Sequence, residues 1–444
     1  MDRDWIRRPA TQVERHLTQK RADLGEGVLL SLTLEHSAAQ LSALEEHEAN
    51  EGRRYQHCAG SLIVEEHEHQ ADSRQRGQSP PRAAPCAGRA ESGEMHVRQS
   101  SGVTIFPPSR KRLSRASREF EVILRVVVIG AGRKHKNEAA IARAVRSLGH
   151  SCRLVNAVTW TQNFGRLAAP WLTRQVESFE PDTLILGRHA MLLGEDRLKK
   201  LLRGRYSTFW YFDLRVPPIR DVLTLGRMVD AMFVTYLPTL ETYRSLGVSN
   251  VMYLPQGMDP ELDRPAQSIP RRYRCEVAFI GGNSPHRNAV LRAMASAYDL
   301  QIRGPGWRKA LPGLPIAGGP IYGKGYAQAV AAAAISLGAH SLPEMAFQTA
   351  SASNRMWKVM GCGGFYLGEW VDGIDAFGEE GVHCAWYRDL GDGIEKVRYY
   401  LDRPEERKRI AETGRRHALK HHTYAHRVRL LLEGRDYPIG QTIS

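Results

Sequence analysis

The chain has 444 residues, 42% of them hydrophobic, so its length allows two or three domains with substantial cores. No run of 18 or more apolar residues occurs, and the first residues lack the apolar segment of a secretion signal. These features exclude a typical membrane-spanning protein, and we expect a soluble protein of the cytoplasm.

The formal net charge is +14, and nearly all of it is carried by residues 121–444. Residues 1–120 hold 18 basic and 17 acidic residues, so nearly all of the excess falls on the remainder. Such a charge favours anionic partners, namely nucleotides, phosphorylated lipids, nucleic acid or an anionic membrane surface. The six cysteines fit neither a zinc site nor a disulfide framework, as is usual in a reducing cytosol.

Residues 1–120 lack sustained apolar periodicity and are rich in Arg, Glu, Gln, Ser and His. Stretches such as 71–82 cannot bury enough apolar surface to offset the entropy of ordering. We interpret this part as a disordered extension, although translation from a mis-assigned start codon would look the same. A chain that starts near Glu121 should fold and melt at the temperature of the full chain.

Regular structure is predicted from 124–130, a continuous apolar run that ends in glycine, as buried parallel strands do. A helical pattern over 138–148 follows, and apolar runs then alternate with helical stretches. The further strands are expected at 152–155, 183–186, 208–212, 231–234 and 251–254. This alternation predicts a first domain, over 121–265, with a parallel sheet covered on both faces.

A proline-rich stretch at 255–270 indicates a linker, and a second alternation occupies 272–424. Its strands are expected at 276–282, 300–303, 334–337, 365–367 and 383–385. The chain ends in helices at 389–401, 404–413 and 425–433, and the last of them, in a segment 425–444, is expected to cross back to the first domain. The sequence thus predicts an α/β fold of two Rossmann-like doubly wound domains, which bind ligands at the carboxyl ends of their strands.

The first glycine-rich turn is Gly130-Ala-Gly-Arg-Lys-His-Lys136, directly after a predicted strand. A dinucleotide fingerprint would need a glycine where His135 stands, and no acidic ribose partner follows the second strand. This disfavours an NAD enzyme. The turn is either a plain strand-to-helix turn or a basic loop that contacts a phosphate or an acceptor.

The second glycine-rich turn places Gly281 and Gly282 after a strand, and Ser284 with Pro285 then favours a helix start. The free N–H groups of a helix N-terminus can bind a diphosphate. Arg287 lies in the first helical turn, where the helix dipole disfavours a cation. This position favours a phosphate-binding role for Arg287.

The third motif, Ser-Asn-Arg-Met-Trp-Lys-Val-Met-Gly-Cys-Gly-Gly-Phe-Tyr-Leu at 353–367, is the most informative. Ser353 can cap a helix, and the glycines at its end allow a sharp entry into the next strand. A plain helix-turn-strand explains these glycines. It does not explain Asn354 and Arg355 at the helix start, which would face the cleft.

A series of short motifs runs through residues 275–432: Phe279-Ile-Gly, Ser353-Asn-Arg, Met360-Gly-Cys-Gly-Gly-Phe, Val371-Asp-Gly-Ile, Tyr387-Arg-Asp-Leu, Val397-Arg-Tyr-Tyr-Leu-Asp-Arg-Pro-Glu-Glu-Arg407 and His422-Thr-Tyr-Ala-His-Arg427. In these motifs the chain resembles the spore-maturation CgeB-like family of bacterial glycosyltransferases, which is similar to group 1 transferases of GT-B fold. The N-terminal half matches less specifically, through Trp210-Tyr-Phe-Asp213 and Leu254-Pro-Gln-Gly257.

The resemblance implies that the second domain binds a nucleoside-diphosphate sugar and that the first domain binds the acceptor. By resemblance and topology, the candidate donor-binding residues are Gly281, Gly282, Arg287, His340, Ser353, Asn354, Arg355, Lys358, Gly363 and Gly364. Related retaining transferases carry a Glu-x7-Glu motif, and its two positions hold Ala350 and Lys358 here. A lysine cannot accept a ribose hydroxyl as Glu does, so the donor is held differently, the activity is weak, or Lys358 neutralises a phosphate.

Two residues of the first domain are candidates for catalysis. His189 and Asp213 follow predicted strands at the same sheet edge: His189 could act as base, and Asp213 could orient an acceptor hydroxyl or act as base. A structural histidine and a turn-initiating aspartate are the plain alternatives. The sequence has no D-x-D pair in a suitable loop, and we expect chemistry without a metal or cofactor. The late histidines are interpreted as helix-surface residues: His417, His421, His422 and His426.

Two other functions stay open beside a glycosyltransferase. One is a nucleotide-sugar epimerase of the same shape, and the other is a non-catalytic nucleotide-sugar binding protein, which Lys358 favours. The acceptor could be a glycan, a lipid-linked sugar, a protein or a small molecule, and peripheral membrane contact is compatible with the charge. Nucleic-acid binding is disfavoured because the basic residues are dispersed and no recognised module is present.

Overall fold

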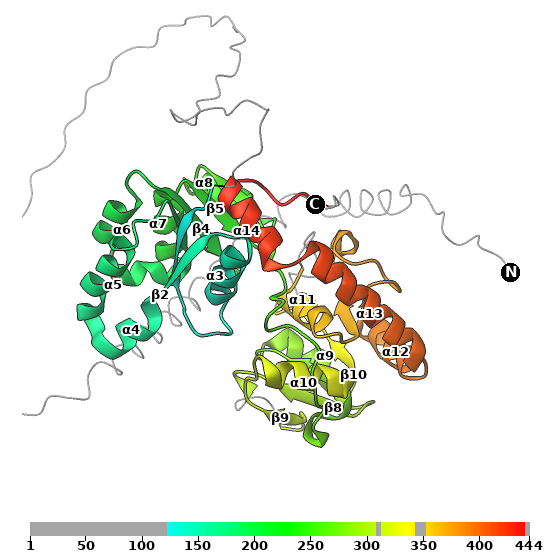
Figure 1. The fold of residues 1–444 in the computed structure, drawn as a ribbon. Helices are drawn as coiled ribbons and strands as arrows, with labels where there is room; N and C mark the ends of the chain where they lie inside the picture. Colours follow the sequence, from blue (N-terminus) through cyan, green and yellow to red (C-terminus); the bar gives the residue numbers. More distant parts are fainter. Residues whose placement is uncertain (1–121, 216, 308–311, 342–351, 440–444) are drawn as a thin grey trace, which may run out of the picture. The chain divides into compact units, whose positions relative to one another are not determined.

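The computed structural model describes residues 122–215, 217–307, 312–341 and 352–439, all within one compact unit of the chain (Figure 1). The expectations for residues 1–120 and for Ala350 lie outside the described residues, as does the end of the 425–444 segment. In the part that is described, no helix has the length and apolar character needed to cross a bilayer.

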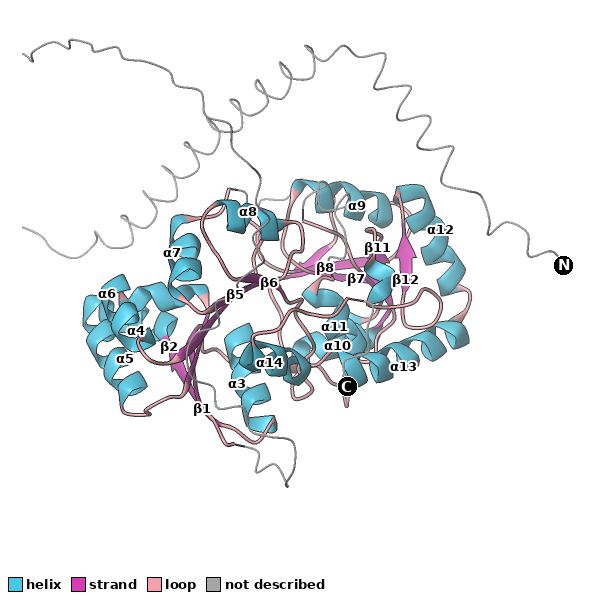
Figure 2. Cartoon of the chain, turned by 90° about the horizontal axis from the view of Figure 1, so that it is seen from above, coloured by secondary structure: helices cyan, strands magenta, loops and turns pink. Residues whose placement is uncertain are grey.

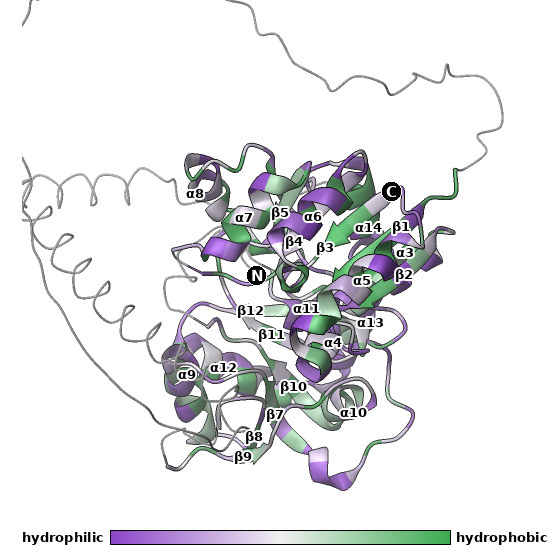
Figure 3. Ribbon diagram, turned by 90° about the vertical axis from the view of Figure 1, so that its left-hand side faces the viewer, coloured by the Kyte–Doolittle hydropathy of each residue, from purple (hydrophilic) through white to green (hydrophobic). Residues whose placement is uncertain are grey.

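The first sheet has six parallel strands in the order β2-β1-β3-β4-β5-β6. They are β1 (Arg125–Gly130), β2 (Ser151–Asn156), β3 (Thr183–Leu186), β4 (Tyr206–Tyr211), β5 (Ala231–Val234) and β6 (Val251–Tyr253). The central strands are almost wholly buried and hydrophobic, as the green colour of β1 and β3 in Figure 3 shows. Continuous apolar runs produce such strands because both faces of the sheet are covered.

Alternate residues of β1 point to opposite faces of this sheet. Val126 and Val128 pack in one core with α3 (Asn137–Ser147), and Val127 and Ile129 pack in a second core with the helices of the other face. Figure 2 shows the same two layers on either side of the strands. The remaining elements of this domain are α4 (Ala157–Phe164), η1 (Gly165–Leu167), α5 (Ala168–Glu177), η2 (Arg188–Leu193), α6 (Glu195–Leu202), α7 (Arg220–Met228) and α8 (Thr239–Ser245).

The second sheet is also parallel, in the order β12-β11-β10-β7-β8-β9. Its strands are β7 (Cys275–Ile280), β8 (Leu300–Arg303), β9 (Ile316–Gly318), β10 (Ala333–Leu337), β11 (Tyr366–Glu369) and β12 (Ala385–Tyr387). Its helices are α9 (Pro285–Ala295), α10 (Lys324–Ala332), α11 (Asn354–Gly361), α12 (Leu390–Leu401) and α13 (Pro404–His421). The predicted fold class of two Rossmann-like doubly wound domains is confirmed.

The predicted linker at 255–270 is fixed at several points. Met258 bridges to Thr423, and the guanidinium of Arg143 on α3 donates to Asp259, with 2.9 Å between Nε and Oδ2. The carboxylate of Asp263 accepts the backbone N–H of Asp259 at 2.9 Å. Both aspartates are buried, so this connection holds the two domains together by specific contacts.

The last helix, α14 (Tyr424–Glu433), packs against α3 of the first domain. The Tyr424 hydroxyl donates to Asn137 at 3.1 Å, and Val428 and Leu431 are fully buried. The Tyr206 hydroxyl donates to the Leu431 carbonyl at 3.3 Å. The apolar spacing of the last helix therefore has its partner surface in the first domain.

Of the late histidines, His422 is buried, whereas His417, His421 and His426 are half-buried, so the prediction of helix-surface residues is wrong for His422. His422 is buried and stacks on Trp357 of α11, with 4.2 Å between ring centroids. Its Nδ1 accepts from Arg427 at 3.0 Å, and His417 Nε2 lies 3.0 Å from the Phe377 carbonyl. The error has a local cause, because α13 continues past its predicted end at 413 and places His422 at its buried C-cap.

Acid should destabilise the fold through these histidines. Burial lowers the pKa of His417 and of His426 to about 4, and lowers that of His422 well below its ordinary value. The unfolded chain binds these protons near pH 6.5, so stability is full above that pH and declines toward pH 4. We expect each histidine to reduce the free energy of unfolding by at most about 1.4 kcal/mol per pH unit, less where solvent screens it.

Urea denaturation at neutral pH and near pH 5 measures this loss. His417→Asn should shrink the difference between the two free energies, even if it lowers both. Equal free energies of unfolding for the unmodified protein at the two pH values would contradict the assignment.

Candidate active site

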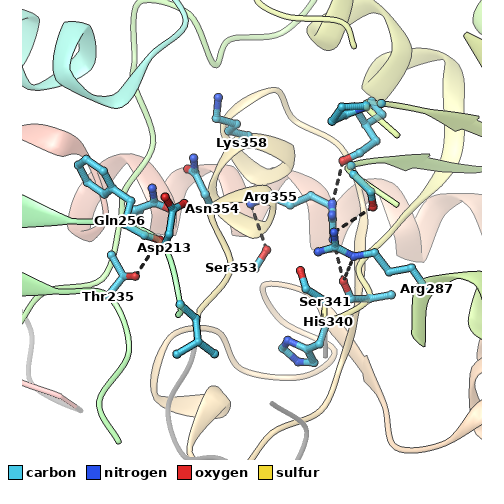
Figure 4. A pocket seen from close by; sticks show the side chains of 18 of the residues that line it. Asp213, Thr235, Gln256, Arg287, His340, Ser341, Ser353, Asn354, Arg355 and Lys358 are labelled. Atoms are coloured by element: carbon cyan, nitrogen blue, oxygen red, sulfur yellow. Dashed lines mark hydrogen bonds between the residues drawn. The ribbon is translucent and has the colours of Figure 1, made fainter. Parts of the chain in front are cut away.

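A cavity of about 920 Å³ lies where the carboxyl ends of the two sheets face each other. Its walls are the loops after β3, β4, β5 and β6 on one side, and the loops after β7, β8, β9 and β10 with the start of α11 on the other. Figure 4 shows Asp213, Thr235 and Gln256 facing the first turns of α11 across this space. Open parallel sheets bind ligands at this edge.

Two guanidinium groups lie side by side at the point where the strand order of the second sheet reverses, between β7 and β10 (Figure 4). Arg355 donates from Nε to the Ile280 carbonyl at 2.9 Å and from Nη1 to the Ala339 carbonyl at 3.2 Å. Arg287 donates to the same Ala339 carbonyl at 3.1 Å and to the Gly282 carbonyl at 3.0 Å. Ligands of doubly wound sheets bind at such topological switch points.

The charge of these two arginines is not balanced by a direct partner. Within the described ranges, neither guanidinium forms an ion pair with a carboxylate; the nearby Glu369 accepts from His286 instead, at 2.8 Å. Burial and the neighbouring charge of Arg355 lower the pKa of Arg287. Both guanidinium groups lie over the Phe279 ring, and their side-chain hydrogen bonds within the described residues go to carbonyls. Two adjacent cations without a carboxylate among these partners form a site suited to an anion with several oxygens.

Two helix N-termini border the arginines, as the sequence predicted. Ser284 caps α9 and accepts the Arg287 N–H at 3.3 Å, and Ser353 caps α11 and accepts the Arg355 N–H at 3.1 Å. Asn354 and Ser353 line the main cavity. The capped helix starts therefore add backbone dipoles to the positive charge of the side chains.

Glycines in the loops after β7 and β8 let the backbone lie close to the guanidinium of Arg355. A Cβ on Gly281 would overlap the guanidinium of Arg355, and a Cβ on Gly304, whose φ is +152°, would overlap the Gly281 carbonyl. Gly282 also lines the cavity but has room for a side chain. Gly281 is therefore required by the position of Arg355.

Lys358 projects from the second turn of α11 and lines the main cavity and an adjoining hollow. Its Nζ lies 5.9 Å from the centre of the Tyr326 ring, and within the described part of the chain it forms no ion pair. The lysine is thus a free positive charge between the two spaces.

His340 lines the main cavity and is held by Glu369, a residue to which the sequence gave no role. The His340 backbone N–H donates to Glu369 Oε2 at 2.8 Å, and burial lowers the pKa of the imidazole. The sequence did hold a signal for Glu369, because an acidic residue at the end of a strand beside β10 lies at the ligand-binding edge of the sheet. The neutral imidazole can serve as a hydrogen-bonding group for a sugar or phosphate.

Gly363 and Gly364 lie elsewhere, at the opposite end of α11 from the capped start. Gly363 has a φ of +78°, and a Cβ on Gly364 would overlap Val330. Neither glycine lines the cavity, so we assign both to the turn into β11 and not to donor binding.

A second hollow of about 330 Å³ lies over the first sheet and contains both catalytic candidates, His189 and Asp213. The buried Glu138 lies at its base, beside the carboxyl ends of β1 and β3. A Cβ on Gly130 or Gly187 would come within 2.6 or 2.5 Å of its Oε1, so these glycines make room for the carboxylate. His189 Nδ1 is 3.9 Å from this carboxylate. Sequence reasoning missed Glu138, although it follows the first glycine-rich turn closely.

Asp213 is exposed and lines both spaces, with its Oδ2 3.8 Å from Arg188 Nε. Because Asp213 is exposed, it can contact an acceptor, whereas Glu138 is the buried carboxylate of this hollow. His135, the residue that excluded a dinucleotide fingerprint, stacks on Tyr322 of the second domain with 3.8 Å between ring centroids and 9° between planes. This stack joins the two domains beside the cavity.

Comparison with known proteins supports a transferase. Residues 287–433 match a family described as glycosyl transferase-like, and no curated protein matches the sequence. The chain is similar to Alr3699/HepE of Anabaena, solved with UDP and glucose, at 12% identity over 70% of this chain and 98% of that chain, with a TM-score of 0.50.

Two further solved structures match the chain with lower TM-scores. Sucrose-phosphate synthase of Thermosynechococcus elongatus has 12% identity over 69% of this chain and 97% of that chain, with a TM-score of 0.48. A glycosyltransferase of Rickettsia africae has 11% identity over 69% and 97%, with a TM-score of 0.48. The predicted GT-B-like arrangement is confirmed, and the family match over the second domain supports a group 1 glycosyltransferase.

Proposed function

We propose that the protein transfers a sugar from a nucleoside-diphosphate donor to an acceptor bound over the first sheet. The observation that carries this proposal is the pair Arg287 and Arg355 at the switch point of the second sheet, which has no carboxylate partner among the residues that the structure describes. A diphosphate there would gain charge-assisted hydrogen bonds worth about 1.5–3 kcal/mol each. The donor's sugar would then extend toward His340 and the first domain.

The same residues would act on the leaving group. Cleavage of the donor leaves a nucleoside diphosphate with one more negative charge than in the bound sugar ester, and fixed cations stabilise that charge as it develops. Arg287, Arg355 and Lys358 all border the cavity. This supply of charge is the basis for proposing chemistry without a metal ion.

For the acceptor side we propose His189 as general base and Glu138 as the residue that positions it. His189 would take the proton of the acceptor hydroxyl while the carboxylate of Glu138 stabilises the imidazolium that forms. The side chain of Glu138 is 8% exposed and that of His189 is 34% exposed, so one is shielded while the other can reach substrate. Asp213, more exposed and close to Arg188, would orient the acceptor.

The finer assignments are also proposals. We place the chain in the CgeB-like branch on the motifs between 275 and 432, and in the cytoplasm on its free thiols. The donor domain would be 272–424 and the acceptor domain 121–265, with the last helix completing the latter.

A thermal-shift screen of nucleotide-sugars tests donor binding, because a ligand at about one hundred times its Kd adds about 2.7 kcal/mol of stability. Product analysis with the stabilising nucleotide-sugar then separates the functions. Transfer of the sugar to an added acceptor supports the proposal. An epimerised nucleotide-sugar would identify an epimerase instead, and binding without turnover would identify the binding protein that Lys358 favours.

A further inference from the structure

An apolar patch lies on the surface of the first domain, on α4, η1 and α5. Phe164 is 52% exposed, Leu167 80% and Trp171 40%. Trp160 joins two of them, since its ring centroid lies 5.1 Å from that of Phe164 and 4.0 Å from that of Trp171. We call these four residues the aromatic patch.

This patch differs from most other exposed apolar side chains of the described residues; the exception is the consecutive pair Val122 and Ile123, at the start of the described residues. Leu246, Ile316 and Tyr399, for example, each stand on a separate element, which is normal for a protein surface. Contiguous exposed apolar groups are unusual in a protein that is free in solution and mark a contact surface. Figure 3 shows hydrophobic and hydrophilic segments side by side on α4 and α5.

The charge around the patch identifies its partner. The segment 157–177, which spans α4, η1 and α5, contains Arg166 and Arg174 and one acidic residue, Glu177, at the end of α5. Both arginines are exposed, and neither has a hydrogen-bond or ion-pair partner in the described part of the chain. Tryptophan and phenylalanine with an excess of arginine over acids match the interface of a bilayer with anionic headgroups.

The patch lies next to the second hollow. α4 begins directly after β2, at the same sheet edge as the hollow, and α4 and α5 pack against η2. The first residues of η2 are Arg188 and His189, which line the hollow. A surface that touched the patch would therefore lie near the acceptor side of the site.

We propose that the aromatic patch docks the protein on an anionic membrane surface and that the acceptor is borne by a lipid. The docking stands on the patch alone, whereas the acceptor assignment rests on the proposed function. Phe164, Leu167 and Trp171 insert among the headgroups and upper acyl chains, while Arg166 and Arg174 contact lipid phosphates.

The test is co-sedimentation of the full chain with vesicles of phosphatidylcholine alone and of phosphatidylcholine mixed with phosphatidylglycerol. The double variant Phe164→Ser, Leu167→Ser changes two exposed side chains without changing the charge. We expect its affinity for the mixed vesicles to fall by about tenfold. Leu246→Ser with Tyr399→Ser is the matched apolar control and should bind like the unmodified protein.

A second pair tests the charges. Arg166→Ala with Arg174→Ala should weaken binding to the mixed vesicles more than Arg197→Ala with Arg203→Ala, which removes the same charge from exposed positions on or next to α6. Absent vesicle binding, equal loss in patch and control variants, or equal binding to neutral vesicles would overturn the proposal. Nucleotide-sugar thermal shifts should be the same in all variants, so failure of the proposed function and failure of docking are distinguishable.

Discussion

Replacing Arg355 with alanine should weaken nucleotide-sugar binding by about tenfold or more, because one charge-assisted hydrogen bond is worth more than the 1.4 kcal/mol that changes affinity by a decade. Arg287→Ala should have a similar effect, since both guanidiniums share the Ala339 carbonyl and face one site. The measurement is the Kd of the best nucleotide-sugar by isothermal titration calorimetry.

The matched control is Arg292→Ala, because Arg292 lies exposed in the last turn of α9, away from the capped start. Arg355→Lys keeps the positive charge but cannot donate to two carbonyls in the same geometry. Its affinity for the nucleotide-sugar should therefore lie between those of the unmodified protein and of Arg355→Ala. The melting temperature should change little, since the carbonyls left by Arg355 border an open cavity where water can reach them. An unchanged Kd in either alanine variant would refute the site.

Replacing His189 with alanine should lower kcat by about 10²–10⁴-fold, the usual contribution of a general base. The KM for the donor should stay the same, because His189 lines the second hollow and not the main cavity. Initial rates of nucleoside-diphosphate release, with the donor found in the screen, measure both quantities.

Glu138→Gln tests the positioning role of the carboxylate. Its shape is kept but the charge that stabilises the imidazolium is lost, so kcat should fall by about tenfold or more with an unchanged donor KM. Glu241→Gln, on exposed α8, is the control. Full activity of His189→Ala would eliminate His189 as the base and leave Asp213 as the remaining candidate.

Local apolar patterns were sufficient for most of the fold. The strands predicted at 183–186, 231–234 and 300–303 coincide with β3, β5 and β8. β3 and β5 are buried, largely apolar runs, as central parallel strands are, whereas β8 alternates buried Leu300 and Ile302 with half-buried polar residues. β9 was missed because it is a three-residue edge strand between proline and glycine, with little burial to create a pattern. α13 was ended too early at Gly414, which lies inside the helix; a Cβ there would overlap the His383 carbonyl, so close packing explains this glycine and not the end of the helix.

The site was predictable where its residues follow strand ends or helix starts. Arg287 and Arg355 were found in this way, since each lies in the first turn of a helix capped by serine. Glu369 was missed although it closely follows a predicted strand, because its partner His286 is 83 residues distant in the chain and only the fold brings the two together. Glu138 likewise acquires its meaning only when the fold brings β1 and β3 together at Gly130 and Gly187.

A crystal structure with a bound nucleoside diphosphate would show directly whether the two arginines bind the donor. We expect the diphosphate between Gly281 and the start of α11, with oxygens about 2.7–3.2 Å from nitrogens of both Arg287 and Arg355. A diphosphate bound at the basic turn around Arg133 and Lys136 of the first domain, with both arginines left without a ligand, would contradict this expectation.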